Sequence, residues 1–260
     1  MAKFLVEVDE NTMLPSSDSV AIIELCNFEN WKYNKKEHEI YFGMIARNRV
    51  YSSVRNMAGD SRMPDGTYDL TDFIPVGSIR FVNSILNEIG KLPLKPINIP
   101  KELNIAEFTG RDTGEGSIQD AIDFMEKHNG AIIKSNTIVK KYEALYAKSS
   151  RDIPSDSRYF YSEIVDIDTE WRVFVHNNKI VDIRRYCGEY SNTVDIDFVN
   201  KCISTYTNSP KSYVIDIAKL KDGKYIVLEV ANFVSCGLYG AADPKFIHMI
   251  INGWNHEISK

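Results

Sequence analysis

The sequence has no long apolar run and no excess of basic charge, and each absence excludes a class of protein. A transmembrane helix needs about 20 mostly apolar residues, and no run here approaches that length. The opening segment MAKFLVEVDE also lacks the apolar core of a signal peptide, so we expect a cytoplasmic protein. With 31 basic against 36 acidic residues, the net charge is −5, and a nucleic-acid partner is not expected.

Cysteine and histidine are too scattered for a zinc site of the finger type. The four cysteines, at positions 26, 187, 202 and 236, contain no Cys-x-x-Cys pair. We therefore interpret them as four reduced, mostly buried thiols. The five histidines include no His-x-x-x-His pair, which argues against a histidine-based metal site. Hydrophobic residues nevertheless make up 43% of the chain, a fraction typical of soluble globular proteins with a sizeable core.

The first part of the chain mixes short apolar runs with one helical pattern. Residues 3–8 and 20–25 are typical of strands, and residues 40–45 form a third apolar segment without a clear period. Residues 78–89 place their apolar side chains on one helical stripe. A loop-like stretch carries four arginines, Arg47, Arg49, Arg55 and Arg62. They form either an anion-binding patch or a solvated surface, and we favour the solvated surface.

Three closely spaced prolines mark a domain boundary. They stand at positions 93, 96 and 100, and no helix can cross such a segment. We therefore expect an N-terminal domain over residues 1–95 and a second domain over residues 100–260.

The second domain begins with a glycine-rich segment and two predicted strands. Residues 110–117, GRDTGEGS, precede a helix that begins near Ile118. This segment matches neither the Walker spacing nor the dinucleotide spacing, so we interpret it as a loop, with a phosphate cradle as the alternative. Strands are predicted over residues 131–134 and 159–165, the first of them ending in Lys134.

The remaining residues are predicted to form two β-hairpins and two helices. One hairpin turns at Asn177-Asn178 and the other at Asp222-Gly223, dipeptides that favour two-residue turns. Helical stripes follow at residues 198–206 and 246–254. Strands and helices in this order indicate an α+β fold rather than a doubly wound sheet.

The second hairpin brings two carboxylates together. In a two-residue turn Lys221 pairs with Lys224, and counting back along both strands places Asp216 directly opposite Glu229. Their Cβ atoms are then about 4.5–5.5 Å apart, and two carboxylates in apolar strands repel each other. A magnesium ion between them would resolve this, because it takes one or two carboxylates plus substrate phosphates. The alternatives are that a lysine or arginine pairs with one carboxylate, or that a longer turn shifts the register.

The first hairpin, counted in the same way, places Glu170 opposite Arg185 and Arg172 opposite Ile183. Arg172 lies in the apolar strand WRVFV, where a charge is unexpected. Its guanidinium suits bidentate recognition of a phosphate. The alternative is a salt bridge to Glu170 or to another carboxylate.

Lys134 and Lys140 add two cations, although each of them, taken alone, is interpreted equally well as a solvated surface lysine. Together with Arg172 and the pair formed by Asp216 and Glu229, they make a set suited to a nucleoside triphosphate and its metal. The cations would contact phosphate oxygens, and the carboxylates would bind magnesium.

Five segments in this order resemble the ATP-grasp fold. They are Ile133-Lys134, Ser162-Glu163-Ile164-Val165, Glu170-Trp171-Arg172-Val173-Phe174-Val175, Val214-Ile215-Asp216 and Leu228-Glu229-Val230-Ala231-Asn232, with the tail Gly237-Leu238-Tyr239 in support. The chain is most similar to the clade named for one arginine and two lysines, over roughly residues 100–240. The resemblance implies an ATP-grasp fold of two α+β lobes that clasp ATP, over about 100–165 and 166–260. A smaller α/β N-terminal domain would precede it.

The resemblance also implies the roles of individual residues. Lys134 and Lys140 would contact the ATP phosphates, with Lys141 as a substitute for Lys140. Arg172 would contact the γ-phosphate or an acyl phosphate, and Arg172 and Lys140 would be catalytic. The hinge that reads adenine through its backbone would comprise Ser162, Glu163, Ile164 and Val165.

Three residues would hold magnesium by this resemblance: Asp216, Glu229 and Asn232. Many family members place an asparagine two residues after the glutamate, and here that position is Ala231. Asn232 is one residue later, on the opposite face of a regular strand, unless a bulge intervenes.

The implied activity is an ATP-dependent, ADP-forming ligase that activates a carboxylate as an acyl phosphate for attack by an amine. Its partners would be ATP, Mg²⁺ and an acid and an amine that the sequence does not identify, with the acceptor selected largely by residues 1–95. The alternative is a nucleotide-binding or partner-binding protein without turnover. Two other enzyme classes are excluded, because Asp166-Ile167-Asp168-Thr169 has its threonine one position early for a haloacid-dehalogenase phosphatase, and Leu220 stands where a Lys-x-Asp-Gly ligase needs lysine.

Overall fold

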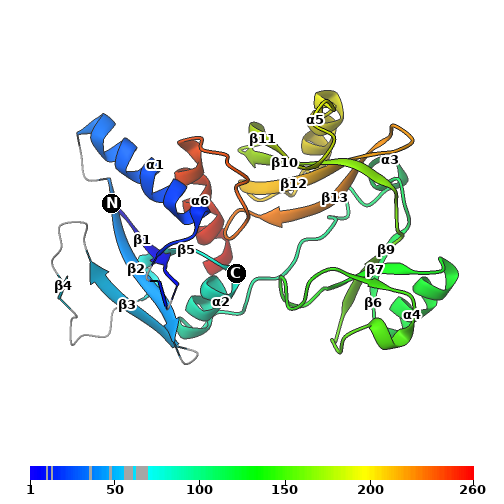
Figure 1. Ribbon diagram of the computed structural model, residues 1–260, viewed down its shortest axis with the longest axis horizontal. Coiled ribbons are helices and arrows are strands. Elements are labelled where there is room, and N and C mark those ends of the chain that lie inside the picture. Colours follow the sequence, from blue (N-terminus) through cyan, green and yellow to red (C-terminus); the bar gives the residue numbers. More distant parts are fainter. Residues whose placement is uncertain (10, 13, 35–36, 47–48, 56–60, 63–69) are drawn as a thin grey trace. The chain divides into compact units, whose positions relative to one another are not determined.

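A computed structural model of the chain describes residues 1–9, 11–12, 14–34, 37–46, 49–55, 61–62 and 70–260. These residues form two compact units (Figure 1). The first unit combines residues 1–93 with residues 233–260, and the second comprises residues 94–232. The break at Pro93 falls beside the prolines of the expected boundary. The last 28 residues, however, group with the N-terminal unit rather than with the segment before them. The expected domains, residues 1–95 and 100–260, stay a prediction.

The first unit is built on a mixed sheet. Its strands are β1 (Ala2–Glu7), β2 (His38–Ala46), β3 (Arg49–Arg55), β4 (Ser61–Arg62) and β5 (Phe73–Val76). Their order is β4-β3-β2-β1-β5, with β1 parallel to both β2 and β5 and with β3 antiparallel to β2. The helices are α1 (Ser17–Tyr33), α2 (Ile79–Glu88) and α6 (Lys245–Ile258), and a short 3-10 helix spans Leu70–Asp72.

Two predictions for this unit are wrong and others are confirmed. Residues 20–25 belong to α1 and not to a strand, because Ser16 caps a helix that continues to Tyr33. Parts of the loop-like stretch form β3 and β4. The side chains of Arg47, Arg49, Arg55 and Arg62 lie outside the described residues, so the anion-patch alternative has no structural description. The strand near residues 3–8 and the helices near residues 78–89 and 246–254 are confirmed.

The second unit contains two four-stranded sheets, each covered by one helix. The first sheet has the order β6-β9-β7-β8, with β6 (Thr113–Gly116), β7 (Ala131–Ser135), β8 (Leu145–Ala147) and β9 (Tyr159–Ser162). Helix α4 (Ile118–Lys127) packs Ala121 and Met125 against the buried side chains of this sheet. The glycine-rich segment is therefore strand β6, preceded by the short helix α3 (Ala106–Thr109), and not the loop that we expected.

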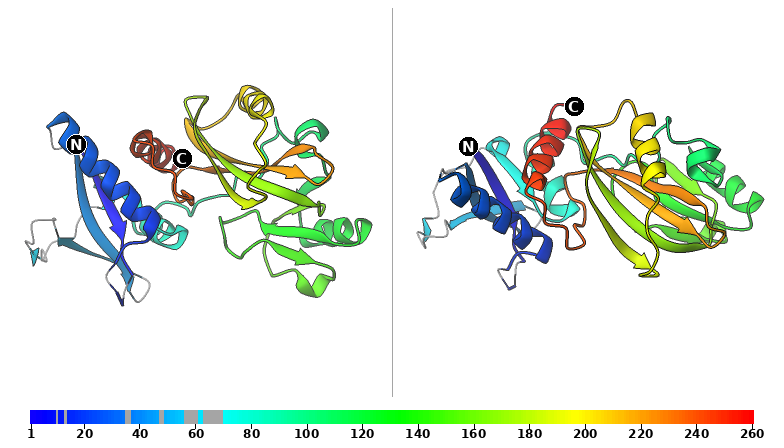
Figure 2. Two further views of the ribbon diagram at one scale, coloured as in Figure 1. Left: turned by 45° about the horizontal axis from the view of Figure 1, so that its top comes forward. Right: turned by 90° about the horizontal axis from the view of Figure 1, so that it is seen from above.

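The second sheet has the order β11-β10-β12-β13 and is antiparallel throughout. Its strands are β10 (Ile167–His176), β11 (Lys179–Gly188), β12 (Ser212–Leu220) and β13 (Tyr225–Asn232). Helix α5 (Ile196–Thr205) lies over one face, as the views in Figure 2 agree, and buries Val199, Cys202 and Ile203 against it. The opposite face of the sheet is left for the candidate site.

The described helices and cysteines bear on two further points. None of the described helices is both long and apolar enough to cross a membrane. None of the four cysteines is in a disulfide, and only Cys26 and Cys202 are buried, while Cys236 is half-buried and Cys187 is exposed. The expectation of mostly buried thiols therefore holds for two of them.

Asp156 anchors the loop that connects β8 to β9. Its carboxylate accepts hydrogen bonds from Ser135 Oγ at 2.7 Å, Thr137 Oγ1 at 2.9 Å and Lys141 Nζ at 2.9 Å. Burial on its own would raise the pKa of Asp156, but the hydrogen bonds from Ser135, Lys141 and Thr137 lower it to about 2 from the usual 3.8. The ionised carboxylate thus stabilises the folded chain.

We expect Asp156→Asn to lower the free energy of unfolding at pH 7 by about 2 kcal/mol. A carboxyl group whose pKa is depressed in the folded state stabilises that state when ionised, and the substitution removes this contribution. The contribution is complete above the unfolded-state pKa and disappears as the pH falls through about 2. Urea unfolding at several pH values measures it: the gap between wild type and variant should close toward pH 2. Glu143→Gln, at an exposed position in the segment between β7 and β8 that also carries Lys141, is the control. A gap that does not change with pH would contradict the assignment.

Candidate functional site

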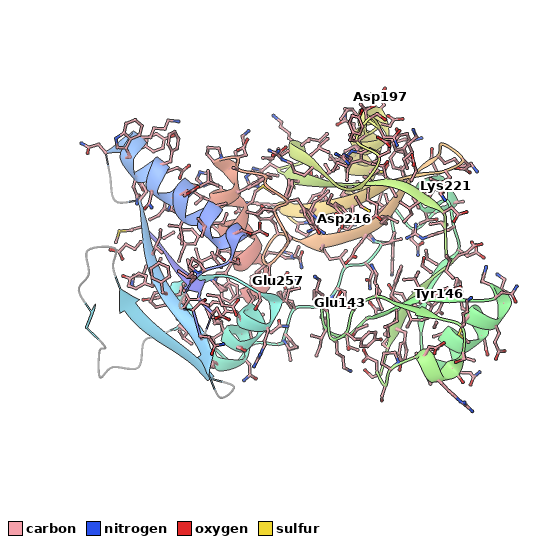
Figure 3. All side chains as sticks on the ribbon, in the orientation of Figure 1. Glu143, Tyr146, Asp197, Asp216, Lys221 and Glu257 are labelled. Atoms are coloured by element: carbon pink, nitrogen blue, oxygen red, sulfur yellow. The ribbon has the colours of Figure 1, made fainter. Side chains whose placement is uncertain are left out.

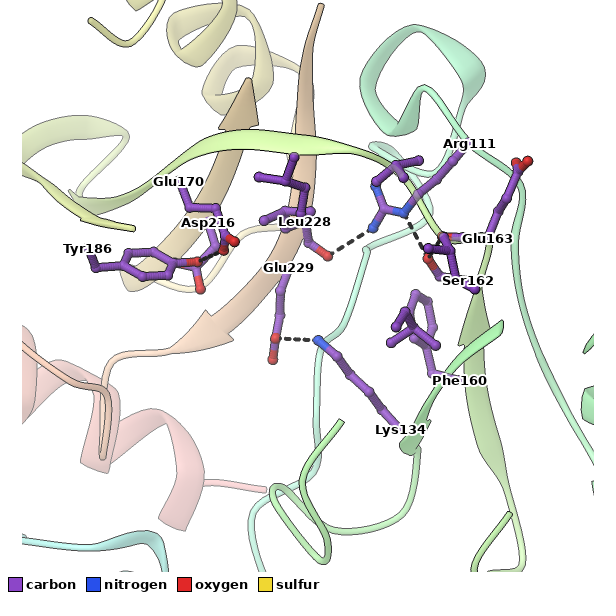
Figure 4. A pocket seen from close by; sticks show the side chains of 14 residues that line it. Arg111, Lys134, Phe160, Ser162, Glu163, Glu170, Tyr186, Asp216, Leu228 and Glu229 are labelled. Carbon is purple, nitrogen blue, oxygen red and sulfur yellow. Dashed lines mark hydrogen bonds and ion pairs between the residues drawn. The ribbon is translucent and has the colours of Figure 1, made fainter. Parts of the chain in front are cut away.

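A pocket of about 230 Å³ lies between the two sheets of the second unit (Figure 4). Six apolar residues form one part of its lining: Ile132, Phe160, Ile164, Val165, Ile167 and Leu228. The other part is polar or charged, with Arg111, Lys134, Ser162, Glu163, Glu170, Tyr186, Asp216 and Glu229. The pocket thus combines apolar surface for a ring with cations and carboxylates for charged groups.

Asp216 and Glu229 lie directly opposite each other on β12 and β13, as the sequence predicts. The predicted two-residue turn is nevertheless wrong, because Leu220 N–H donates to Lys224 O at 2.8 Å and three residues lie between them. A bulge on β13 compensates, since Leu228 is an extra residue between the pairs Asp216–Glu229 and Ile217–Val227. Figure 3 shows Lys221 at the tip of this hairpin, away from Asp216.

The bulge also explains why two consecutive residues face the pocket. Regular strands alternate their side chains between faces, yet Leu228 and Glu229 both line the pocket. Leu228 contributes to its apolar part and Glu229 to its charged part. A single local irregularity therefore joins the two parts.

Arg172 forms a bidentate ion pair with Asp216. Its Nε donates to Asp216 Oδ1 at 2.8 Å and its Nη2 to Oδ2 at 2.7 Å, with both side chains largely buried. Its guanidinium carbon also lies 6.0 Å from the centre of the Tyr186 ring. The salt-bridge alternative for Arg172 is thus observed, with Asp216 rather than Glu170 as the partner.

The partners predicted across the first hairpin are wrong. The turn itself is as expected, because Asn177 and Asn178 both have positive φ, 49° and 58°, and His176 pairs with Lys179. Two bulges on β11 then shift the register, and the first of them, at Val181, places Arg172 opposite Arg184 instead of Ile183. Glu170 lies opposite Cys187 instead of Arg185.

Lys134 reaches the carboxylate pair from the other sheet. Its Nζ lies 2.6 Å from Glu229 Oε2, which joins β7 to β13 across the pocket (Figure 4). Burial raises the pKa of Asp216, and the bonds from Arg172 oppose this shift. Each carboxylate therefore has one cationic partner in the protein, which is how the chain tolerates two acidic groups at this position.

The carboxylate pair fits a magnesium ion by the chemistry of its oxygens. A carboxylate has about four lone-pair positions, so Asp216 can accept two bonds from Arg172 and still ligate a metal. Among the described residues, no group of three or more His, Cys, Asp or Glu could hold a metal ion. Magnesium needs fewer, because it typically combines one or two carboxylates with substrate phosphates and water.

Residues 163–166 connect β9 to β10 and lie outside both strands. The strand predicted over 159–165 ends at Ser162, so Ser162 is paired in the sheet and the other three residues of the proposed hinge are not. Glu163 N–H donates to Asp112 O at 2.9 Å, while the side chains of Ile164 and Val165 line the pocket. The structure thus brings all four hinge residues to the pocket.

Arg111 is a pocket residue that our sequence interpretation missed. Its Nε donates to Ser162 Oγ at 2.8 Å, and its Nη1 and Nη2 donate to the carbonyls of Val227 at 2.9 Å and Leu228 at 3.2 Å. Burial lowers its pKa to about 10. These acceptors are neutral oxygens, so none of them neutralises the charge of the guanidinium. A lone arginine in a glycine-rich segment carries no pattern that would have identified it.

Four of the predicted residues do not line the pocket. Arg172 contacts it only through Asp216, with which it is paired. Lys140 is exposed in the loop after β7, and Lys141 is paired with Asp156. Asn232 continues the regular pairing of β13 after Glu229, opposite Tyr213, and does not line the pocket. Ala231 therefore occupies the position on the face of Glu229 where many family members have asparagine.

Comparisons with known proteins agree with this architecture. The D-alanine-D-alanine ligase from Coxiella burnetii superposes with a TM-score of 0.55 at 12% identity, covering 99% of this chain and 95% of that one. D-alanyl-alanine synthetase A from Vibrio cholerae has a TM-score of 0.52 at 10% identity, with 100% and 99% covered. A RimK domain ATP-grasp protein from Sphaerobacter thermophilus has 0.52 at 11% identity, with 96% and 97% covered. At these identities the likeness shows the fold.

No curated protein matches the chain significantly. A family model matches residues 108–249, which is more than half of the 260 residues. The model describes the ATP-grasp domain of family 2 in the clade named for one arginine and two lysines. ATP-grasp proteins are mostly ATP-dependent ligases. The match covers both sheets that form the pocket, and the chain belongs to the ATP-grasp family, in the clade of one arginine and two lysines.

Proposed function

We propose that this protein is an ADP-forming ligase that joins a carboxylate to an amine. The observation that carries the proposal is the pocket in which Lys134, Asp216 and Glu229 meet beside an apolar lining. This combination matches the two ends of ATP, because the base is flat and largely apolar while the phosphates require cations and a metal.

The pocket residues would divide the nucleotide between them. The hinge at residues 162–165 and the apolar lining would hold the base. Lys134 would contact phosphate oxygens, as would the buried guanidinium of Arg111, and Lys140 would reach them only if its loop moved. Asp216 and Glu229 would hold Mg²⁺, which when bound neutralises phosphate charge.

The chemistry would proceed in two steps. An oxygen of the acid attacks the γ-phosphorus of ATP, and the bond to the leaving ADP breaks to give an acyl phosphate. The amine then attacks the acyl carbon, phosphate leaves, and the ammonium proton is lost. This route splits a difficult condensation into two feasible steps. Arg172, held beside Asp216, would stabilise charge on the transferring phosphoryl group.

A second candidate is a nucleotide-binding protein without turnover. Ala231 favours it, because this residue has no side-chain oxygen at the position where many family members supply a metal ligand. Asn232 does not replace that ligand in the pocket.

Titration calorimetry and an ADP-release assay separate the two candidates. We expect ATP to bind and its affinity to increase with magnesium. A screen of acids, with hydroxylamine as a general amine, should then give ADP and a hydroxamate. ATP binding without ADP formation for any acid would favour the second candidate, and no ATP binding at all would refute both.

Lys134→Ala should weaken ATP binding about tenfold or more. A charge-assisted contact contributes about 1.5–3 kcal/mol, and 1.4 kcal/mol corresponds to a tenfold change in affinity. The variant also leaves Glu229 without the Lys134 ion pair, so the phosphates would meet an uncompensated carboxylate. Calorimetry with ATP and magnesium measures the effect, with Lys148→Ala at an exposed position of the same sheet region as control. An unchanged dissociation constant would return Lys134 to the role of a surface lysine.

A further inference from the structure

The guanidinium of Arg111 joins three separate segments of the second unit. Its Nε donates to Ser162 Oγ at 2.8 Å, at the end of β9. Its Nη1 donates to Thr109 O at 3.0 Å and Val227 O at 2.9 Å, and its Nη2 donates to Leu228 O at 3.2 Å (Figure 4). Arginine has five N–H groups, and these bonds use four of them. The side chain is therefore held in one orientation, with one N–H left for a ligand.

Two of the acceptors are consecutive carbonyl groups at the bulge of β13. In a regular antiparallel strand, successive carbonyl groups point toward opposite edges, so a single donor group does not meet both. The extra residue of a bulge disrupts this alternation, and Leu228 is that residue. The fork of the guanidinium matches the two carbonyls that the bulge brings together. Arg111 is therefore bound to the bulge itself.

Gly110 allows the backbone beside Arg111 to lie against β13. Its φ is 57°, and a Cβ atom at this position would lie 2.5 Å from Ile226 Cγ2. Such a close approach at positive φ requires glycine. The segment that carries Arg111 is thus built to contact β13 next to its bulge.

The position of the bulge decides which residue faces Asp216. With Leu228 as the extra residue, Glu229 lies opposite Asp216. If Glu229 were the extra residue, Leu228 would lie opposite Asp216, and the pairs before and after this position would stay the same. The two arrangements differ only here, and the bonds from Arg111 favour the observed one, in which the bulge presents both carbonyls.

We propose that Arg111 is a positioning residue that fixes the bulge at Leu228 and thereby keeps Glu229 opposite Asp216. The inference deepens the proposed function, in which these carboxylates hold Mg²⁺, and it rests on that function only for the effect on metal binding. A phosphate contact through the remaining N–H is a separate role that depends on charge. Lysine separates the two roles, because it keeps the charge but loses the planar fork that spans the carbonyls.

The magnesium dependence of nucleotide binding measures the effect on the metal site. A non-hydrolysable ATP analogue is titrated into wild type and Arg111→Lys, once with excess Mg²⁺ and once with a chelator. The ratio of the two affinities should fall about tenfold or more in the variant, as for other residues that support a metal ligand. The affinity without metal should change much less. Arg158→Lys, the same substitution at an exposed arginine before β9, should keep the ratio.

The pairing of the strands tests the inference without metal or nucleotide. Amide–amide NOEs between β12 and β13 report which residue faces Asp216. In Arg111→Lys the contacts of Asp216 with Glu229 should weaken or be replaced by contacts with Leu228. Deleting Leu228 removes the bulge, so Arg111→Lys combined with this deletion should regain both the pairing and the magnesium dependence.

The outcomes distinguish this inference from the proposed function. If Glu229 stays opposite Asp216 in Arg111→Lys, or if a magnesium-dependent wild type keeps its ratio in the variant, the inference is refuted. A folded double variant that regains neither property would refute it as well. If the pairing changes but the wild type shows no magnesium dependence, positioning by Arg111 stands and the proposed metal site is refuted. Unfolding curves ensure that folded proteins are compared.

Discussion

Arg172→Ala should lower kcat for ADP formation by at least about a hundredfold while ATP affinity changes much less. The guanidinium of Arg172 is fixed by its place in β10, by two bonds to Asp216 and by the ring of Tyr186. A fixed cation contributes most where charge develops, which is in the transition state of phosphoryl transfer. Arg172→Lys keeps the charge but loses the planar fork, so its kcat should also fall.

The measurement must separate this loss from a loss of stability. Removing Arg172 leaves Asp216 buried without the guanidinium, a change that typically costs about 3–5 kcal/mol. Arg172→Gln retains hydrogen-bond donors toward Asp216 and should be more stable than Arg172→Ala, yet equally slow. Steady-state kinetics at temperatures where unfolding curves show all variants folded give the comparison. If ATP binding collapses while kcat at saturation survives, Arg172 anchors the ground state instead.

Asp216→Asn should remove the dependence of ATP binding on magnesium. Changing a residue that merely supports a metal ligand typically costs 10–100-fold in metal affinity, so losing a ligand should cost about a hundredfold or more. Asparagine keeps an oxygen that can accept a bond from Arg172, which limits the damage to the fold. ATP titrations with magnesium and with a chelator should then give similar, weak affinities.

Asp222→Asn provides the control for this experiment, because Asp222 lies at the tip of the same hairpin, away from the pocket. It should keep the full magnesium dependence. Asp216→Asn binding ATP with magnesium as tightly as the wild type would show that the metal lies elsewhere.

The sequence predicted the elements around the site better than their register. Strand β7, helices α4 and α5, both hairpins and the facing of Asp216 and Glu229 were accessible from apolar periodicity and turn residues. The prediction that Asp216 lies opposite Glu229 is nevertheless correct only because two errors cancel. The predicted turn is one residue too short, and the bulge at Leu228 is missed. Bulges have no reliable signature in a single sequence, because they depend on packing between strands.

The remaining errors have similar physical causes. The run VAIIEL at residues 20–25 is too short to distinguish a strand from a helix, and the cap at Ser16 and the length of α1 decide for the helix. The bulge at Val181 replaces Ile183 by Arg184 as the neighbour of Arg172, and the further bulge at Tyr186 places Cys187 opposite Glu170. Arg111 binds carbonyl groups from a strand more than a hundred residues later, a contact that no local pattern encodes.

The bulge at Leu228 also affects how the carboxylate pair can be recognised in divergent relatives. A bulge adds one residue to one strand without changing which residues face each other beyond it. Asp216 and Glu229 are 13 positions apart only because this residue is present. A relative without it would keep the same facing carboxylates at a separation shorter by one, and an ungapped alignment would then match its glutamate to Leu228. Evolutionary profiles of this clade should therefore allow a single-residue gap just before the glutamate.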